Sequence, residues 1–347
     1  MPDTTIVDLR SDSVTKPTPE MRRAMAEAIV GDDGREGDPT AQRLEKTGAE
    51  MVGQEAGLFC TSGTMANLVA LMTHLKPGEE VMAERESHFL RFEAGGLAAV
   101  AHGFPRPLPG RAGRMDLEQV EREIQPGSRL RPRTALIEVE NTHNNAGGAC
   151  LDADYMRALW AIAKKHGIAV HLDGERIFNA AIALGVPAPE LTKGCDSVML
   201  GLSKGLCAPY GSLLCGSAEF TARARDMRHR IGGNVRQIGH MAAAGIVALQ
   251  TMVDRLAEDH ANARRLAEGI NRVHAGLVDM ETCQTNIVSV DTSLLGRPAA
   301  KLAAALNERG VQGLPLGEYR LRFVTHHDVT TAQIDHALGV IGEVFGG

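Results

Sequence analysis

The sequence lacks the features that mark several classes of protein. Its 347 residues carry a net charge of −6, from 37 Lys and Arg against 43 Asp and Glu, and contain no long basic block. Nucleic acid is therefore not an expected partner. No apolar run reaches the ~18 residues of a membrane span, and the polar N-terminus has no apolar signal core. We expect a cytoplasmic protein that does not bind membranes.

Cysteine pairs, nucleotide fingerprints and metal-binding spacings are also missing. There is no G-x-G-x-x-G, so a dinucleotide loop is not predicted, and no metal-ligand spacing, so no metal is expected. Six scattered cysteines without C-x-x-C spacing indicate reduced, mostly buried thiols. Cys207 lies three residues after Lys204 and is either a reactive thiol or a small residue that fills space.

The most informative stretch is Gly167 to Arg176. Its apolar, β-branched residues are typical of a buried strand in a parallel sheet, and Asp173 ends that strand. Ligands of such sheets bind outside the carboxyl ends of the strands. A second apolar run, Asp196 to Leu202, is followed by Lys204. A lysine that carries the cofactor as a Schiff base, facing an aspartate for the pyridinium nitrogen, is the pair that pyridoxal phosphate requires.

A candidate phosphate site precedes this pair in the chain. A short strand ends at Cys60, and Ser62, Gly63 and Thr64 then lead into a helix over 65–72. A glycine, hydroxyl groups and the free N–H groups of a helix start together form an anion cradle, although loops of this composition also occur without a ligand. Arg236, beside a Gly-Gly turn, is a second candidate to contact a phosphate.

Other candidates have two interpretations each. His88 either stacks on a pyridine ring or is an ordinary surface histidine. The glycine- and acid-rich loop 31–40 is a solvated connection or a lid, with Thr40 expected to cap the next helix. Arg320 and Arg322 share one face of a predicted strand, and one of them is expected to clamp a carboxylate.

The order of apolar patterns predicts an α/β fold. Strands alternate with helices from about 55 to 215, which favours a mostly parallel sheet with right-handed crossovers. One long helix, over about 240–273, is expected to lead out of this sheet region into a smaller α+β domain. We predict a large domain over 1–250, including an N-terminal arm over 1–20, and a small domain over 251–347.

Seven motifs in sequence order resemble those of L-threonine aldolases of the low-specificity or L-allo type. They are Asp8–Asp12, Gly63–Thr64, Ser87–His88 with Glu93–Gly96, Glu140–Asn144, His171–Ala180, Leu202–Leu206 and Arg322–His326. The resemblance covers nearly the whole chain. It implies a fold-type I pyridoxal-phosphate enzyme, with an aspartate-aminotransferase-like large domain on a mixed, mostly parallel sheet and a small C-terminal α+β domain.

The resemblance also implies roles for individual residues. Lys204 matches the Schiff-base lysine, Asp173 the partner of the ring nitrogen, and His88 the residue stacked on the ring. The remaining matches are Ser62, Gly63, Thr64 and, from a neighbouring subunit, Arg236 for the phosphate; Arg176 near cofactor and substrate; Ser11, Arg176 and Arg322 for the substrate carboxylate; and His143 near the substrate hydroxyl. Family members are dimers or tetramers, so a homo-oligomer, as a homotetramer or a dimer, with its site at the subunit interface is expected.

The implied reaction is cleavage of L-threonine, L-allo-threonine and related L-3-hydroxy amino acids to glycine and an aldehyde, which makes the chain an aldehyde-lyase. The base that takes the hydroxyl proton stays open between His143, His88 and a bound water. Alternatives on the same scaffold are β-elimination, racemisation and transamination. A catalytically silent scaffold is the alternative from another class, and intact Lys204 and Asp173 argue against it.

Two positions depart from the family pattern. Arg35 stands in a loop where the family often has an aromatic residue, and Glu175 stands where Asp-Gly-Ala-Arg is usual. We interpret them either as residues that change the polarity of the substrate pocket, and so the preferred aldehyde, or as a surface ion pair.

Overall fold

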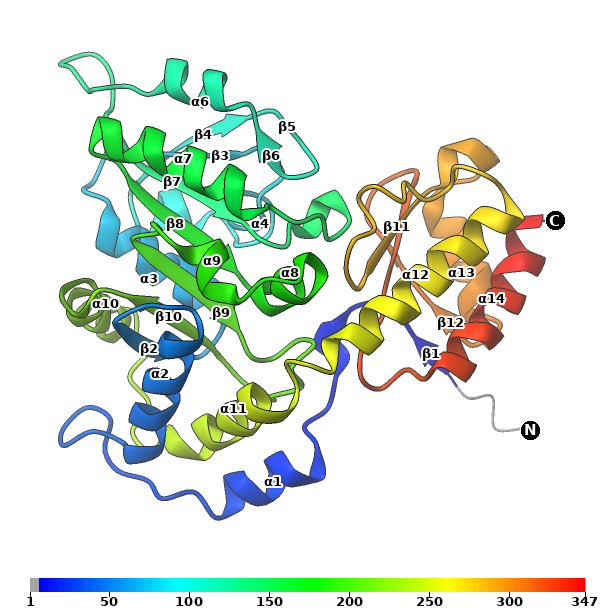
Figure 1. Cartoon of the computed structure of the whole chain (residues 1–347), viewed down its shortest axis with the longest axis horizontal. Helices are drawn as coiled ribbons and strands as arrows, with labels where there is room; N and C mark the ends of the chain where they lie inside the picture. The colour runs from blue at the N-terminus through cyan, green and yellow to red at the C-terminus, as the bar shows by residue number, and fades with distance from the viewer. Residues whose placement is uncertain (1–5, 347) are drawn as a thin grey trace.

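The computed structural model describes residues 6–346 and shows two parts (Figure 1). One part is built on a seven-stranded sheet and the other on a smaller sheet near both chain ends. The first five residues of the predicted arm, and the last residue of the chain, lie outside the described residues. The predicted division at residue 250 stays a prediction.

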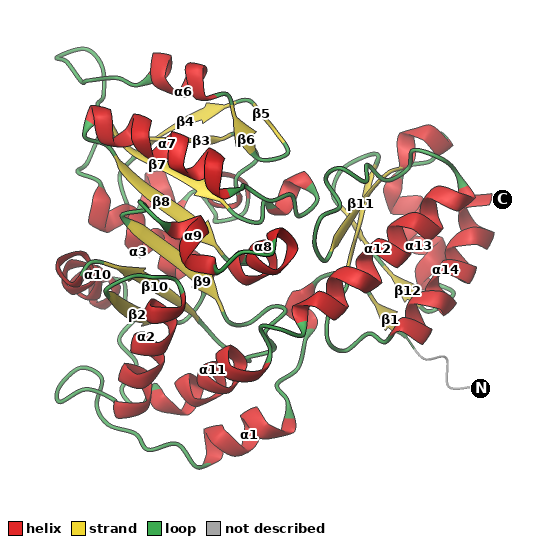
Figure 2. Ribbon diagram, viewed as in Figure 1, coloured by secondary structure: helices red, strands yellow, loops and turns green. Residues whose placement is uncertain are grey.

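The large sheet has the strand order β2-β10-β9-β8-β7-β3-β4. Only β10 runs antiparallel to its neighbours, and the other pairings are parallel. The predicted α/β class with a mixed, mostly parallel sheet is therefore confirmed (Figure 2). The strands are β2 (Ala56–Cys60), β3 (Glu80–Glu84), β4 (Phe104–Leu108), β7 (Thr134–Glu140), β8 (Ala169–Gly174), β9 (Ser197–Gly201) and β10 (Ser212–Gly216).

The two-residue period of β8 explains how one strand serves both core and site. Val170 and Leu172 are fully buried in the main hydrophobic core on one face of the sheet. His171 and Asp173 alternate with them and therefore point to the opposite face. Because β8 is central and its neighbours β7 and β9 are parallel to it, the site is built where three strand ends meet.

Helices cover both faces of the large sheet. The face that carries Asp173 is covered by α3 (Gly63–His74), α4 (His88–Arg91), α5 (Gly96–Ala99) and α10 (Ala218–Arg230). The opposite face packs in the main core with α2 (Pro39–Met51), α6 (Leu117–Glu123), α7 (Ala153–His166), α8 (Ile177–Leu184), α9 (Ala188–Thr192) and α11 (Gly239–Thr251), and α1 (Pro19–Ala26) lies on α11. A hairpin of β5 (Gly110–Arg111) and β6 (Arg114–Met115) and the turn η2 (Asn144–Ala146) complete this part.

The smaller part is an antiparallel sheet with helices on it. Its strands are β11 (Ile287–Asp291), β14 (Arg320–Val324) and β13 (Leu314–Pro315), in that order. Its helices are α12 (Leu256–Val273), α13 (Ala299–Asn307) and α14 (Thr331–Gly346), with the turn η3 (Thr292–Leu295). The smaller part has its own hydrophobic core, which is the second core of the protein. The N-terminal strand β1 (Val7–Asp8) pairs with β12 (Val311–Gln312), and Val7 and Leu9 are buried in this second core. Residues 7–9 therefore pack against the C-terminal part, and the chain then crosses to the site through η1 (Asp12–Val14).

Two local predictions were wrong. The predicted long helix over 240–273 is broken between α11 and α12, because α11 buries Ala242 and Leu249 in the main core while α12 buries Leu266 and Ile270 in the second core. Asp38, not Thr40, caps α2, and its Oδ1 accepts from the N–H groups of Thr40 and Ala41. Pro39 occupies the first helical position, where no donor is needed.

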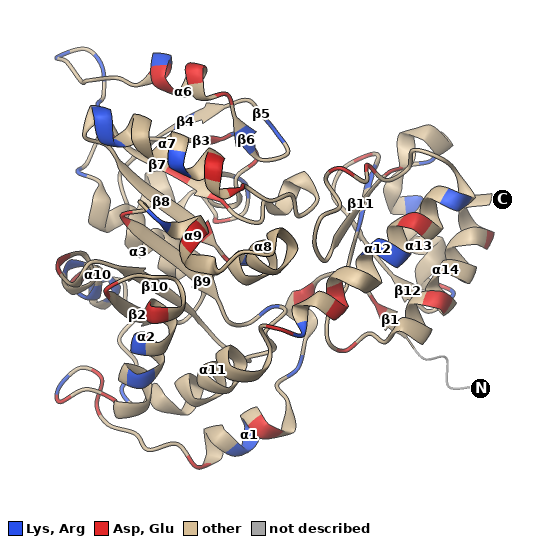
Figure 3. Ribbon diagram, in the orientation of Figure 1, with Lys and Arg blue, Asp and Glu red and all other residues tan. Residues whose placement is uncertain are grey.

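All six cysteines are buried and unpaired, and burial raises the pKa of the Cys207 thiol to about 12, which fits the space-filling interpretation. Basic and acidic residues are interspersed over both parts (Figure 3). None of the described helices has both the length and the apolar character needed to cross a membrane.

Candidate active site

A cavity of about 190 Å³ lies at the carboxyl ends of β7, β8 and β9. Many of the residues predicted from sequence line it: Gly63, Thr64, His88, Asp173, Arg176 and Lys204. The structure thus brings the predicted lysine, aspartate and anion cradle together in one cavity, from segments that span more than a hundred residues of sequence.

Asp173 is held by hydrogen bonds although it is almost fully buried. Its Oδ2 accepts from Nδ2 of Asn67 at 2.8 Å, and its Oδ1 accepts from the backbone N–H of Glu175 at 3.1 Å. A buried carboxylate without such partners would be strongly disfavoured. The two donors fix the direction of the carboxylate and leave it able to meet a cationic group in the cavity.

Asn67 joins Asp173 to a chain of polar side chains that reaches His88. Its Nδ2 also donates to Glu93 at 2.9 Å, and its Oδ1 lies 3.1 Å from Nε2 of His171. Nδ1 of His88 lies 2.9 Å from Glu93. Burial alone lowers the pKa of His88, but the hydrogen bond to Glu93 and nearby carboxylates raise it overall.

The same group of atoms also has the spacing of a cation site. Ligand-type atoms of His88, Glu93 and Asp173 lie within 4.8 Å of one another. All three residues are, however, already hydrogen-bonded: Glu93 and Asp173 accept from Asn67, and Nδ1 of His88 lies 2.9 Å from Glu93. The prediction that no metal binds stays a prediction.

Lys204 follows β9 and lines the cavity, and its amine has few contacts there. Its Nζ lies 3.7 Å from Oε1 of Glu175, and this is its one ion pair among the described residues. The hydroxyl of Thr15 donates to the backbone oxygen of Lys204 at 2.8 Å. The N-terminal arm therefore holds the lysine loop in place, while the amine stays available for a carbonyl compound.

The start of α3 forms the predicted anion cradle. Ser62 caps the helix, and its Oγ accepts from the backbone N–H of Met65 at 3.1 Å. No hydrogen-bond partner of the N–H groups of Gly63 and Thr64 is found among the described residues. A Cβ at Gly63 would lie 2.4 Å from Oε2 of Glu175, so a larger residue there would push that carboxylate aside. This start of a long helix fits a phosphate group.

Arg176 is fully engaged by an acid that sequence reasoning missed. Its Nε and Nη2 donate to the two oxygens of Asp12 at 2.7 and 2.8 Å, and both side chains are buried. Burial alone would raise the pKa of Asp12, but the Arg176 guanidinium holds it well below its usual range. Asn286 also donates to Asp12 at 3.0 Å. Asp12 therefore joins the arm, the large sheet and the C-terminal part at one point.

Arg322 is also buried, yet it has no carboxylate partner among the described residues. Its Nη1 donates to Oδ1 of Asn144 at 2.9 Å, and Nη1 of Arg176 lies 3.4 Å from the same oxygen. Burial and then repulsion by Arg176 lower the pKa of Arg322 to about 10. A carboxylate bound beside Asn144 would compensate this charge.

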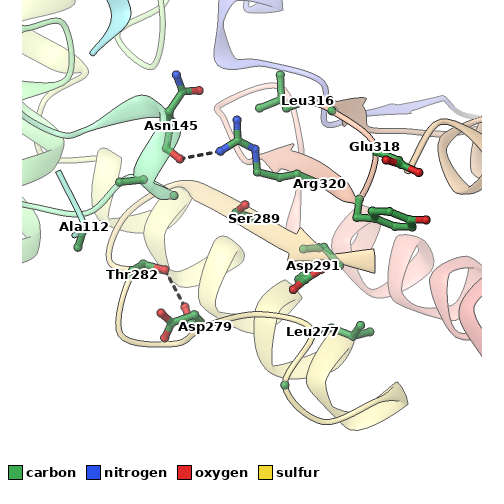
Figure 4. Close-up of a pocket in the computed structure, with 16 residues that line it drawn as sticks. Ala112, Asn145, Leu277, Asp279, Thr282, Ser289, Asp291, Leu316, Glu318 and Arg320 are labelled. Carbon is green, nitrogen blue, oxygen red and sulfur yellow. Dashed lines mark hydrogen bonds between the residues drawn. The ribbon is translucent and has the colours of Figure 1, made fainter. Parts of the chain in front are cut away.

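Arg320, the other arginine on the same strand face, belongs to a neighbouring cavity of about 590 Å³ (Figure 4). Its Nη1 donates to the backbone oxygen of Asn145 at 3.1 Å. The turn η2 thus separates the two arginines, because Asn144 contacts Arg322 and Asn145 contacts Arg320.

His143 lies behind the site and does not line the cavity. It is 1% exposed, and its Nε2 lies 3.2 Å from Glu84 and 3.9 Å from Glu140. Burial alone lowers the pKa of His143, but Glu140 and Glu84 raise it overall. Glu140 also accepts from the backbone N–H groups of His88 and Asn144, at 2.8 and 2.7 Å.

Ser11, Arg35 and Arg236, like Ser62, His143 and Arg322, do not line this cavity within a single chain. Arg35 and Arg236 are exposed and both pair with Asp32, at 3.6 and 2.9 Å. Ser11 caps the turn that begins at Asp12. The interpretation of Arg35 and Glu175 as a surface pair is not what the structure shows, because Arg35 contacts Asp32. The ligand roles of Ser11, Arg35 and Arg236 stay predictions.

Sequence reasoning assigned no role to Asp12, Asn67, Glu93 or Glu140. Three of them, Asp12, Glu93 and Glu140, lie inside motifs that were recognised. Asn67 lies on a helix whose pattern is that of a core helix, and its one signal was a polar residue among apolar neighbours.

Comparison with known proteins places the chain in a family. Residues 8–293 match the protein family described as Beta-eliminating lyase. The chain is 44% identical to Low-specificity L-threonine aldolase 1 of Arabidopsis thaliana, over 96% of this chain and 94% of that protein. It is 40% identical to Low specificity L-threonine aldolase of Escherichia coli (strain K12), over 95% and 96%. Threonine aldolase of Leishmania major has the same fold, with a TM-score of 0.82 at 18% identity, covering 98% of this chain and 99% of that one.

Proposed function

The chain belongs to the beta-eliminating lyase family and, within it, to the L-threonine aldolases, and we propose that its reaction is the one this membership implies. It cleaves L-threonine, L-allo-threonine and related L-3-hydroxy amino acids to glycine and an aldehyde, with pyridoxal phosphate as cofactor. The observation that carries the proposal is the placement of Lys204 and Asp173 in one cavity with the free start of α3.

The cavity fits the cofactor at three points. Lys204 offers a free amine, Asp173 offers a directed carboxylate, and Gly63 and Thr64 offer N–H groups without other partners. When bound, pyridoxal phosphate supplies a protonated pyridine ring that takes up the electron pair released as the Cα–Cβ bond breaks. Asp173 keeps a proton at the ring nitrogen, and Asn67 keeps Asp173 in the orientation for this.

We further propose that Arg322 and Asn144 bind the substrate carboxylate. Arg322 is the buried guanidinium without a carboxylate partner among the residues described, whereas Arg176 is already neutralised by Asp12. Arg176 then acts mainly by holding Asn144 and the arm at the site. Fixing the carboxylate sets the direction of the Cα–Cβ bond, which decides the bond that breaks.

For the base that takes the hydroxyl proton, we propose His88 or a bound water. His88 lines the cavity and its Nδ1 is engaged by Glu93, which leaves Nε2 for the substrate. His143 is buried behind Glu84 and Glu140, so we propose that it positions the strand end.

The assembly and location are proposed from the same membership. We expect a cytoplasmic dimer or tetramer in which Arg236 contacts the cofactor phosphate of a neighbouring subunit. Arg236 is exposed and lies outside the cavity of its own chain, which agrees with that role. Light scattering after size-exclusion chromatography measures the number of subunits. Arg236→Ala should weaken cofactor binding and leave the number of subunits unchanged.

The direct test incubates cofactor-loaded protein with L-threonine, L-allo-threonine and their D-isomers. We expect glycine and acetaldehyde from the L-isomers. The family description also favours β-elimination as a second candidate function. Elimination of water from threonine, followed by hydrolysis of the enamine, would give 2-oxobutyrate and ammonia instead, so the same assay distinguishes the two reactions.

A further inference from the structure

Glu175, one of the two departures from the family pattern, places its carboxylate inside the cofactor cavity. A Cβ built on Gly63 would lie 2.4 Å from its Oε2, and a Cβ built on Gly201 would lie 2.1 Å from its Oε1. The carboxylate is therefore enclosed between a glycine at the first turn of α3 and a glycine at the end of β9. Any other residue at either position would displace it.

This position is one that favours an anion. The carboxylate lies against the N-terminal turn of α3, where Gly63 and Thr64 have free N–H groups and the helix dipole is positive. Lys204 lies 3.7 Å away, and no side-chain hydrogen bond of Glu175 is found among the described residues. The Glu175 carboxylate is thus held by electrostatic attraction and packing, and no directional hydrogen bond fixes it in this position.

We propose that Glu175 is an internal competitor for the cofactor phosphate. Its carboxylate lies against the anion cradle at the start of α3, and the phosphate enters the cradle only when Glu175 moves away or becomes neutral. The proposal rests on the proposed function, because the competing ligand is the phosphate of pyridoxal phosphate. Two anions at one helix start repel each other strongly in a partly buried cavity.

A pH dependence follows from the groups around Glu175. Burial, together with the charge of Asp173, raises its pKa, while Lys204 and Arg176 oppose the rise and Asp12 adds to it. Glu175 therefore becomes neutral at a less acidic pH than an ordinary glutamate does. Competition is lost when the carboxylate is protonated, so phosphate binding should tighten as the pH falls towards that range.

The experiment compares the wild-type protein with Glu175→Gln after removal of the cofactor from the purified holoenzyme. Binding of inorganic phosphate, pyridoxal phosphate and pyridoxal is measured by calorimetric titration. We expect Glu175→Gln to bind the first two about tenfold tighter, a difference of ~1.4 kcal/mol, and pyridoxal equally well. Glu308→Gln, an exposed glutamate without an ion pair among the residues described, should behave as wild type.

Two results would overturn the proposal. Equal phosphate affinity of Glu175→Gln and wild type would show that the carboxylate does not compete. An equal gain for pyridoxal would show that Glu175 acts through Lys204 and not at the phosphate cradle. If Glu175→Gln does not fold, the pH series on the wild type decides, because phosphate affinity independent of pH, after correction for phosphate ionisation, contradicts the proposal.

Failure of the proposed function gives a different pattern. A loaded protein that releases no aldehyde from any 3-hydroxy amino acid would contradict the aldolase reaction. The phosphate titration does not depend on that reaction, so it still decides whether Glu175 competes at α3.

Discussion

Arg176 and Arg322 are buried side by side beside Asn144, yet they are in opposite electrostatic states. Arg176 has both oxygens of Asp12 as a bidentate partner. Arg322 has an amide oxygen and a backbone oxygen, and no carboxylate among the residues described. The pKa of Arg176 is raised, because Asp12 outweighs the effect of burial, while that of Arg322 is lowered to about 10 by burial.

The difference separates a structural charge from a functional one. A buried ion pair whose partners are both present is a fixed part of the fold, and removal of one partner is strongly destabilising. A buried cation without an anion is unfavourable by itself and persists where a ligand supplies the missing charge. On this basis Asp12 and Arg176 form a structural pair, and we propose that Arg322 is the group that binds the substrate carboxylate.

The largest effect on stability is expected for Asp12→Asn. This change leaves the Arg176 guanidinium buried without its counter-charge, which should lower the free energy of unfolding by ~3–5 kcal/mol. Thermal and urea unfolding followed by circular dichroism measure it. Asp8→Asn is the matched control in the same arm, because its ion pair with Arg10 is exposed and should contribute under ~1 kcal/mol. Equal losses for both variants would remove the distinction between them.

Arg322→Leu should impair substrate binding without loss of stability. We expect KM for L-threonine to rise by roughly 10²-fold, because a buried charge contact to the substrate is worth ~2–5 kcal/mol. The free energy of unfolding should stay unchanged or increase, since an uncompensated charge is removed. Arg320→Leu is the control, on the same strand face but in the neighbouring cavity. A KM change as large in Arg320→Leu, or a loss of stability in Arg322→Leu, would contradict the assignment.

Acid should reduce the stabilising contribution of the ion pair between Arg176 and Asp12. Arg322 has no such ion pair to lose among the residues described. The pKa of Asp12 is lower in the folded than in the unfolded state, so its stabilising contribution is complete above the unfolded value of ~3.9 and is lost as the pH falls through the folded value. Urea midpoints measured from pH 6 to pH 2 should therefore decline less steeply in Asp12→Asn than in wild type. Parallel declines would show that the pair contributes no such linkage.

The smallest effect is expected for Glu93→Gln, which should shift the pH dependence of catalysis. Glu93 is the hydrogen-bonding partner that raises the pKa of His88. Glu93→Gln should lower that pKa and, if neutral His88 is the base, move the acid limb of kcat/KM to lower pH by up to ~1 unit. An unchanged acid limb would leave a bound water as the proposed base.

Much of this site could be predicted because its parts are local in sequence. Asp173 and Lys204 each follow an apolar run, and parallel strand ends meet at one edge of a sheet, so their meeting follows from the pattern. The anion cradle is contained in one strand-turn-helix segment ending in Gly63 and Thr64. The seven motifs then gave the family.

The rest depends on contacts between distant segments. Asp12 and Arg176 are 164 residues apart, and no periodic pattern indicates that they pair. Asn67 was hidden in a helix of core composition, and the break between α11 and α12 reflects two cores that only the tertiary structure separates. The position of His143 likewise depends on a distant segment, because its Nε2 contacts Glu84 at the end of β3.

The most direct test of the account is where the cofactor is attached. The holoenzyme is reduced with borohydride and digested, and the modified peptide is identified by mass spectrometry, with Lys204→Arg as the control. The account predicts a pyridoxyl group on Lys204 and none in the control. A label on any other lysine, or no label on a protein that still cleaves L-threonine, would contradict it.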